Sequence, residues 1–114
     1  MRVLVCGGRS FTDMDKVSRV LADADAQEEI TLLIHGNARG ADALAASWAI
    51  RNRILTLEYP ADWATHAKSA GPIRNQRMLG ASRPDLVIAF PGGRGTADMV
   101  KRARKAGIRV LEVK

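Results

Sequence analysis

Residues 85–96 read DLVIAFPGGRGT, a short apolar run that leads into three glycines within four positions. An apolar run of this length, ended by Pro and Gly, predicts a buried strand, and a helical pattern follows from about residue 95 to 106. Glycines between a strand and a helix let backbone amides approach an anion closely. The stretch therefore predicts a strand–loop–helix unit with a phosphate-binding loop.

The same order of strand, loop and helix recurs along the rest of the chain. We expect strands at 2–6, 31–35, 54–58, 85–89 and 108–113, and helices at 13–26, 40–52, 72–81 and 95–106. Parallel strands joined through helices make right-handed crossovers. The pattern predicts an α/β fold, a three-layer, doubly wound, Rossmann-like domain with a five-stranded parallel sheet in the order 3-2-1-4-5. Such sheets bind ligands where the winding reverses, here between the first and fourth strands.

Two helix starts and one loop are also expected from local signals. Thr12, followed by Asp15 three positions later, is expected to cap the helix at 13–26. Pro72 fits the first position of the helix at 72–81. The stretch 59–71, YPADWATHAKSAG, shows no clear period, and we expect it to be a long loop.

Composition limits the class of protein. The 114 residues fit one domain, 1–114, and 46% hydrophobic with 26% charged residues is ordinary for a soluble protein. The start, MRVLVCGG, lacks the features of a signal peptide, and no apolar run reaches the roughly 20 residues that a bilayer requires. The single cysteine excludes an internal disulfide, and one cysteine with two histidines is too few for a metal site of zinc type. We also expect no cofactor. We expect a cytoplasmic protein without a membrane partner.

The formal net charge of +6 favours an anionic partner. Three glycine-rich segments after expected strands supply candidate binding residues, because their amides and side chains could surround a phosphate. Arg74 and Arg77, three positions apart on one helix face, could add positive charge. The remaining candidates are Gly7, Gly8, Arg9 and Ser10; Gly36, Asn37, Arg39, Gly40 and Asp42; and Pro91, Gly92, Gly93, Arg94, Gly95 and Thr96.

Each candidate also has a purely structural interpretation. The first segment could be an ordinary tight turn. Asp42 could cap its helix or accept hydrogen bonds from ribose hydroxyls. Arg74 and Arg77 could be surface charges, although Arg74 near a helix start opposes the helix dipole. Trp63 could stack on a nucleobase or pack against the domain.

Several motifs together resemble one known group of proteins. GGRSFTD, HGNARGADALAASWA, YPADW, AGPIRNQRM and AFPGGRGTADM, in this order, resemble the SLOG superfamily of Rossmann-like proteins, with the small YspA/cpYpsA-related branch as the best match. The superfamily also includes LOG-type phosphoribohydrolases and the DNA-binding DprA proteins. The resemblance implies that Gly92, Gly93, Gly95 and Thr96 contact phosphate or ribose.

The resemblance to LOG enzymes also implies catalytic positions. Arg77, or else Arg74, matches their arginine on the preceding helix. Their motif PGGxGTxxE places a glutamate where this chain has Met99, and the nearest carboxylate is Asp98. One residue along a helix turns a side chain by about 100°, so the carboxylate would act from a shifted position.

The sequence therefore supports a binding protein or sensor for a nucleotide or a nucleotide-derived phosphorylated molecule. The alternative is an N-glycoside hydrolase of nucleoside monophosphates, with Asp98, Arg77 and Asp42 as the catalytic candidates. Nucleic acid is disfavoured as a partner, because aromatic and basic residues are not interleaved. The Ala-rich helix at 40–52 could form a homodimer contact.

Overall fold

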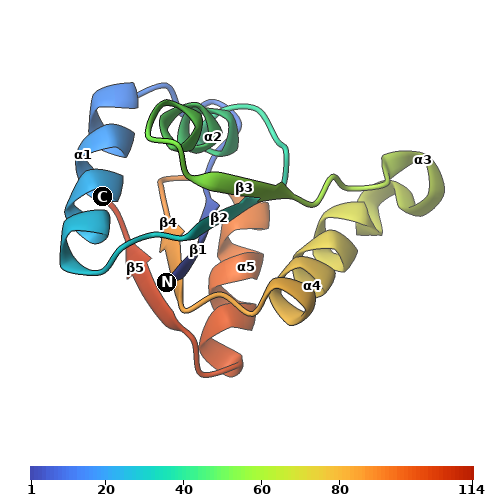
Figure 1. Cartoon of the computed structure of the whole chain (residues 1–114). Helices are drawn as coiled ribbons and strands as arrows, with labels where there is room; N and C mark the ends of the chain where they lie inside the picture. Colours follow the sequence, from blue (N-terminus) through green and yellow to red (C-terminus); the bar gives the residue numbers. More distant parts are fainter.

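The computed structural model describes all 114 residues, Met1–Lys114, and its strands and helices alternate along the chain (Figure 1). The strands are β1 (Arg2–Cys6), β2 (Leu32–His35), β3 (Leu55–Glu58), β4 (Leu86–Ala89) and β5 (Arg109–Glu112). The helices are α1 (Met14–Gln27), α2 (Ala41–Arg51), α3 (Trp63–His66), α4 (Ala70–Ser82) and α5 (Arg94–Lys105), and a short 3-10 helix, η1, spans Ala67–Ser69.

The five strands form one parallel sheet in the order β3-β2-β1-β4-β5. This confirms the fold class and the strand order expected from the sequence. In the register between β1 and β4, Cys6 lies opposite Ala89, so these two strands end side by side. The segments that follow them therefore start from the same place, at the point where the winding reverses.

Two apolar clusters hold the helices on the sheet. On one face, Val5 and Leu33 pack with Leu21 of α1 and Trp48 of α2. On the other face, the residues of α4 and α5 pack against the sheet through the cluster formed by Leu4, Ile34, Met78, Leu79, Val87, Met99 and Val100. Each fully buried side chain of this size contributes about 1.5–3 kcal/mol through the hydrophobic effect. β1 is therefore fixed from both faces, which gives the loop after it a rigid base.

Two expected helix starts are wrong. Asp13, not Thr12, caps α1, and its carboxylate accepts a hydrogen bond of 3.0 Å from the Lys16 amide. α4 begins at Ala70, so Pro72 is its third residue and not its first. Proline is tolerated there because the first amides of a helix have no acceptor within it.

The stretch 59–71 is not the single long loop that the sequence predicted. It contains α3, η1 and the start of α4, and in Figure 1 α3 extends beyond the rest of the molecule. Asp62 caps α3 by accepting a hydrogen bond of 3.1 Å from the Thr65 amide. A helix of four residues is too short to show a hydrophobic period, which is why the sequence pattern did not reveal it. No helix in the structure combines the length and the apolar character needed to cross a bilayer.

Candidate ligand-binding site

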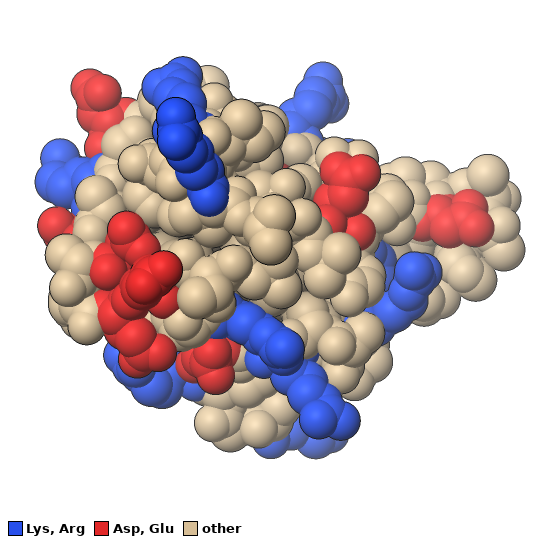
Figure 2. Space-filling view, viewed as in Figure 1, with Lys and Arg blue, Asp and Glu red and all other residues tan.

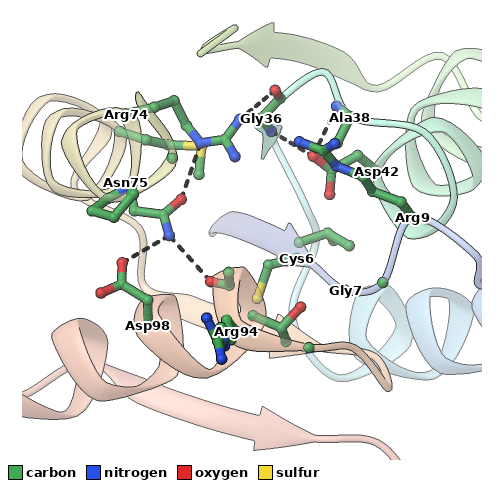
Figure 3. A pocket seen from close by; sticks show the side chains of 18 of the residues that line it. Cys6, Gly7, Arg9, Gly36, Ala38, Asp42, Arg74, Asn75, Arg94 and Asp98 are labelled. Carbon is green, nitrogen blue, oxygen red and sulfur yellow. Dashed lines mark hydrogen bonds between the residues drawn. The ribbon is translucent and has the colours of Figure 1, made fainter. Parts of the chain in front are cut away.

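The carboxyl ends of β1, β2 and β4 open into a pocket of about 540 Å³ (Figure 3). The loops after these strands form its floor and one wall, and residues from α3 to α4 form the opposite wall. Eleven of the predicted site residues line it: Gly7, Gly8, Arg9, Gly36, Asp42, Arg74, Gly93, Arg94, Gly95, Thr96 and Asp98. The three glycine-rich segments thus meet at one place, as the strand order requires.

Direct backbone contacts lock the three segments together. The Gly8 amide donates to the Pro91 carbonyl at 2.9 Å, and the Ala41 amide donates to the Gly8 carbonyl at 3.1 Å. Gly40 has a φ of 76°, and a Cβ on it would lie 2.1 Å from the Gly8 carbonyl oxygen. A Cβ on Gly92 would lie 2.7 Å from the Gly8 nitrogen. Gly40 and Gly92 are therefore required by the packing of the loops themselves.

The loop between β2 and α2 uses its own amides internally. The Asp42 carboxylate accepts hydrogen bonds from the Gly36 amide at 2.9 Å and the Ala38 amide at 3.2 Å. The Asn37 amide donates to His35 Nδ1 at 3.0 Å. Asp42 does not cap α2, whose N-cap is Gly40. Its hydrogen bonds hold the loop in place, and the Gly36 and Ala38 amides are therefore not free to bind another anion.

Burial of Asp42 raises its pKa, because desolvation disfavours the carboxylate. The hydrogen bond from the Ala38 amide and the charges of His35 and Arg74 oppose this shift. Asp42 as a whole is 5% exposed. It is therefore a buried acid whose Oδ2 already accepts two backbone hydrogen bonds.

The start of α5 presents the opposite arrangement. The first bond within this helix runs from the Ala97 amide to the Gly93 carbonyl at 3.0 Å, so the amides of Arg94, Gly95 and Thr96 have no acceptor within the helix. Gly93 is the N-cap and supplies no side-chain acceptor. These amides and the positive end of the helix dipole favour an anion.

Gly93 and Gly95 also differ from the glycines that lock the loops. Both line the pocket, and a Cβ on either would meet no atom within 4 Å. Neither has a positive φ. Gly95 lies within the helix, where a glycine costs roughly 1 kcal/mol relative to alanine, and neither its packing nor a positive φ requires it. Both residues are exposed, and the space above them is open.

Arg74 brings an unpaired positive charge into the pocket. Its guanidinium donates to the Gly36 carbonyl, to the Tyr59 carbonyl at 3.3 Å and to Asn75 Oδ1 at 3.0 Å, all of which are neutral acceptors. Burial lowers the pKa of Arg74, and the charge of Asp42 opposes that effect. The ion pairs of the structure include none of the pocket cations Arg9, Lys68, Arg74 and Arg94, although the pocket residue Asp98 pairs with Arg102. The pocket is therefore suited to a negatively charged ligand.

Asn75 is a site residue that the sequence interpretation missed. The residue is 4% exposed, and its side-chain amide donates to the Gly95 carbonyl at 3.2 Å and to Asp98 at 3.0 Å (Figure 3). Its oxygen accepts from Arg74, so one carboxamide fixes both the arginine and the first turn of α5. The available signal was an asparagine, a poor helix former, placed next to Arg74 in a helix.

The mouth of the pocket carries an aromatic ring. Trp63 of α3 is 48% exposed and lines the pocket together with Lys68. The Arg9 guanidinium lies 5.1 Å from the centre of its ring, which is a cation–π distance. This contact joins the loop after β1 to the segment that contains α3.

Comparison with known proteins shows the family of the chain. The model of the YspA, cpYpsA-related SLOG family matches residues 1–66 of the chain. The chain belongs to this family. The SLOG chain is also 40% identical to the Gene 61 protein of Mycobacterium phage D29, over 96% of this chain and 94% of that protein.

A solved structure is similar to the SLOG chain in fold. DNA processing protein A (DprA) from Streptococcus pneumoniae superposes with a TM-score of 0.79 at 20% sequence identity. The match covers 99% of this chain but only 50% of DprA, so the SLOG chain spans half the length of that protein. At this identity the likeness shows the shared fold.

Asp98 lies at the edge of the SLOG pocket, and Met99 does not reach it. Asp98 Oδ2 accepts hydrogen bonds from Asn75 and, at 2.8 Å, from Arg102. Burial acts to raise the pKa of Asp98, but these hydrogen bonds outweigh it and hold the pKa below its usual range. Met99, at the position of the glutamate in PGGxGTxxE, is fully buried in the core. No carboxylate occupies that position here.

The other predicted site residues of this SLOG chain do not line the pocket. Arg77 stacks over Tyr59, with 5.7 Å between its guanidinium and the ring centre, and so does not accompany Arg74. Asn37 instead lines a groove between α2 and β3. Ser10 and Arg39 are exposed, while Gly40, Pro91 and Gly92 hold the loops together.

Cys6 forms part of the pocket floor, as Figure 3 shows. It is buried, and desolvation together with the charge of Asp42 raises its pKa to about 12. A thiol with this pKa stays protonated at neutral pH and is a poor nucleophile. The structure contains no group of three or more His, Cys, Asp or Glu residues that could hold a metal ion.

Proposed function

We propose that this protein binds a nucleotide or a nucleotide-derived phosphorylated molecule, with a phosphate against the start of α5. The observation that carries the proposal is the open space above Gly93 and Gly95, beside amides that have no acceptor within the helix. Phosphate is the common anion that several amides at a helix start can surround. Glycine at these positions lets its oxygens reach the backbone.

The remainder of the pocket suits the other parts of such a molecule. A volume of about 540 Å³ lies within the usual range for small-molecule sites, roughly 300–1,000 Å³. Arg74 adds a half-buried charge to the lining of the same pocket, and the exposed ring of Trp63 offers a surface on which a base can stack. The SLOG membership of the chain is consistent with this assignment.

The arrangement favours binding over hydrolysis of an N-glycosidic bond. Hydrolysis through an oxocarbenium-like transition state uses a carboxylate against the developing positive charge. Asp98 already accepts hydrogen bonds from Asn75 and Arg102, and Asp42 is occupied by two backbone amides. We therefore expect AMP incubated with the protein to be recovered intact by chromatography. If the parent chain released adenine from AMP and Asp98→Asn did not, the protein would be a hydrolase instead.

The surface gives less support to nucleic acid as the partner. On the face shown in Figure 2, Lys and Arg side chains are interspersed with Asp and Glu and form no continuous basic stripe. A groove that follows a phosphate backbone needs such a stripe. Four cations without an ion pair, Arg9, Lys68, Arg74 and Arg94, instead line one pocket.

The test is isothermal titration calorimetry with AMP, ADP-ribose and NAD, with adenosine as the ligand that lacks phosphate. At least one phosphorylated ligand should bind and raise the melting temperature by mass action, and adenosine should bind far more weakly. Absence of binding by all three at millimolar concentration would contradict the proposal.

Arg74→Ala is the variant that tests the role of charge in this pocket. Removing a charged hydrogen-bond donor costs roughly 1.5–3 kcal/mol, so affinity for the phosphorylated ligand should fall about tenfold to a hundredfold. Arg19→Ala, an exposed arginine of α1, is the matched control and should bind like the parent chain. Equal affinities in the two variants would remove Arg74 from the site.

A further inference from the structure

The edge strand β3 exposes two leucines that no helix covers. Leu55 is 74% exposed and Leu57 is 39% exposed. They lie opposite Leu32 and Ile34 in the sheet register, and therefore on the face that α4 and α5 cover elsewhere. Figure 2 shows a largely uncharged surface over β3, with acidic and basic side chains around it. All four residues of the strand are exposed.

The backbone of β3 also has unpaired groups on its outer side. The Tyr59 amide donates to the His35 carbonyl at 2.9 Å, so the residues of odd number in this strand point their backbone groups toward β2. Successive residues of a strand alternate in this direction. The N–H and C=O of Thr56 therefore point to the free edge. An exposed edge of this kind is a template for another strand.

We propose that β3 pairs with β3 of a second copy of this chain, in an antiparallel arrangement about a two-fold axis at Thr56. Thr56 of each copy then exchanges both backbone hydrogen bonds with Thr56 of the other. Leu55 of each copy then faces Leu57 of the other, which gives two leucine pairs. Both are non-hydrogen-bonded pairs, the kind in which side chains approach most closely. The two sheets join into one, and four leucines form a single apolar cluster.

The charges at the two ends of β3 favour the same partner. Arg51 and Arg53 precede the strand, and Glu58 ends it. An antiparallel pair places the basic end of each strand beside the acidic end of the other. A register centred on Glu58 would instead bring two carboxylates together, which is destabilising. A second copy therefore satisfies the hydrogen bonds, the leucines and the charges together.

The other face of the strand contributes one more apolar contact. Ile50 of α2 is 68% exposed and lines the groove that also contains Thr56. In the paired arrangement, Ile50 of both copies flanks the central pair of threonines. Because two short edges bury less than a standard interface of roughly 1,600 Å², we expect a dissociation constant in the micromolar to sub-millimolar range.

Sedimentation equilibrium from micromolar to millimolar concentration tests the pairing. The parent chain should pass from monomer to dimer across this range. Leu57→Lys, which places a charge in both leucine pairs, should raise the dissociation constant by at least about tenfold, since each pair contributes up to roughly 1 kcal/mol. Leu111→Lys is the matched control on the opposite edge strand, β5, and should leave the dimer unchanged.

Amide hydrogen exchange locates the interface independently. The Thr56 amide should exchange more slowly as the concentration rises, and this protection should be lost in Leu57→Lys. A chain that stays monomeric at millimolar concentration would overturn the proposal. So would a dimer in which the Thr56 amide stays unprotected, or one that Leu111→Lys disrupts and Leu57→Lys does not.

Discussion

The loop after β2 and the loop after β4 look alike in sequence and behave oppositely in the structure. Each joins an apolar strand to a helix through glycines, and each opens into the same pocket. The second residue of the following helix is Asp42 in α2 and Gly95 in α5. Asp42 occupies the amides of its loop, whereas Gly95 leaves the amides around it free. A glycine-rich loop thus keeps its amides available to an external anion only where the chain supplies no anion of its own.

The largest effect that separates the two loops is expected from Asp42→Ala. This change leaves the Gly36 and Ala38 amides without their acceptor in a buried place, and it should lower the free energy of unfolding by about 3 kcal/mol. Chemical denaturation measures it. Asp42→Asn, which keeps an acceptor oxygen, should lose less, and the exposed Asp15→Ala should change stability little. A loss no greater than that of Asp15→Ala would refute the role given to Asp42.

The next effect is expected from Gly95→Asp, which gives α5 the residue that α2 has. A carboxylate at this helix start is compatible with the fold, because a Cβ there meets no atom within 4 Å and acidic residues stabilise helix starts. It should occupy the phosphate position and lower the affinity for the phosphorylated ligand by about thirtyfold, or roughly 2 kcal/mol. Titration calorimetry measures the affinity.

Gly80→Asp is the control for this substitution. Gly80 lies on α4, where a Cβ would likewise meet nothing within 4 Å, and it does not line the pocket. This variant should bind the ligand like the parent chain. If Gly95→Asp also kept full affinity, the phosphate would have to lie elsewhere.

The smallest effect is a pH dependence of the free energy of unfolding, which arises from His35 at the end of β2. Burial lowers the pKa of His35 from its ordinary value of 6.5, against the charges of Asp42 and Glu58. As the pH falls below 6.5, the unfolded chain binds the proton first, so the free energy of unfolding falls through the window down to the folded pKa. Protonation also removes the acceptor of the Asn37 amide.

His66, the histidine of α3, is the control for the pH dependence of stability. His35→Gln should flatten the fall in stability between pH 7 and the acidic side of this window, and His66→Gln, an exposed residue, should not. Denaturation curves at several pH values give the result. An unchanged slope in His35→Gln would assign the pH dependence to another group.

The fold could be predicted from the sequence because its signals are local and agree with one another. Short apolar runs marked the five strands, and the glycines after Cys6 and Phe90 marked the reversal of winding. The segment around α3 could not be predicted, since a four-residue helix held by the Asp62 cap leaves no period.

Only the part of the site that depends on the glycine-rich loops could be predicted from the sequence. The sequence indicated which loops meet, but not which of them had free amides, because that depends on where the Asp42 carboxylate points after folding. Helical spacing predicted that Arg77 and Arg74 would lie together in the site. In the structure, Arg77 instead stacks over Tyr59. Asn75 was missed because its role comes from contacts with α5, far along the chain.

The most direct test of the account is an NMR titration that follows backbone amides as AMP is added. Saturable shifts should be largest at Arg94, Gly95 and Thr96, while the amides of Gly36 and Ala38, already bound to Asp42, should move little. Saturable shifts at Gly36 and Ala38 with an unchanged start of α5 would contradict the account.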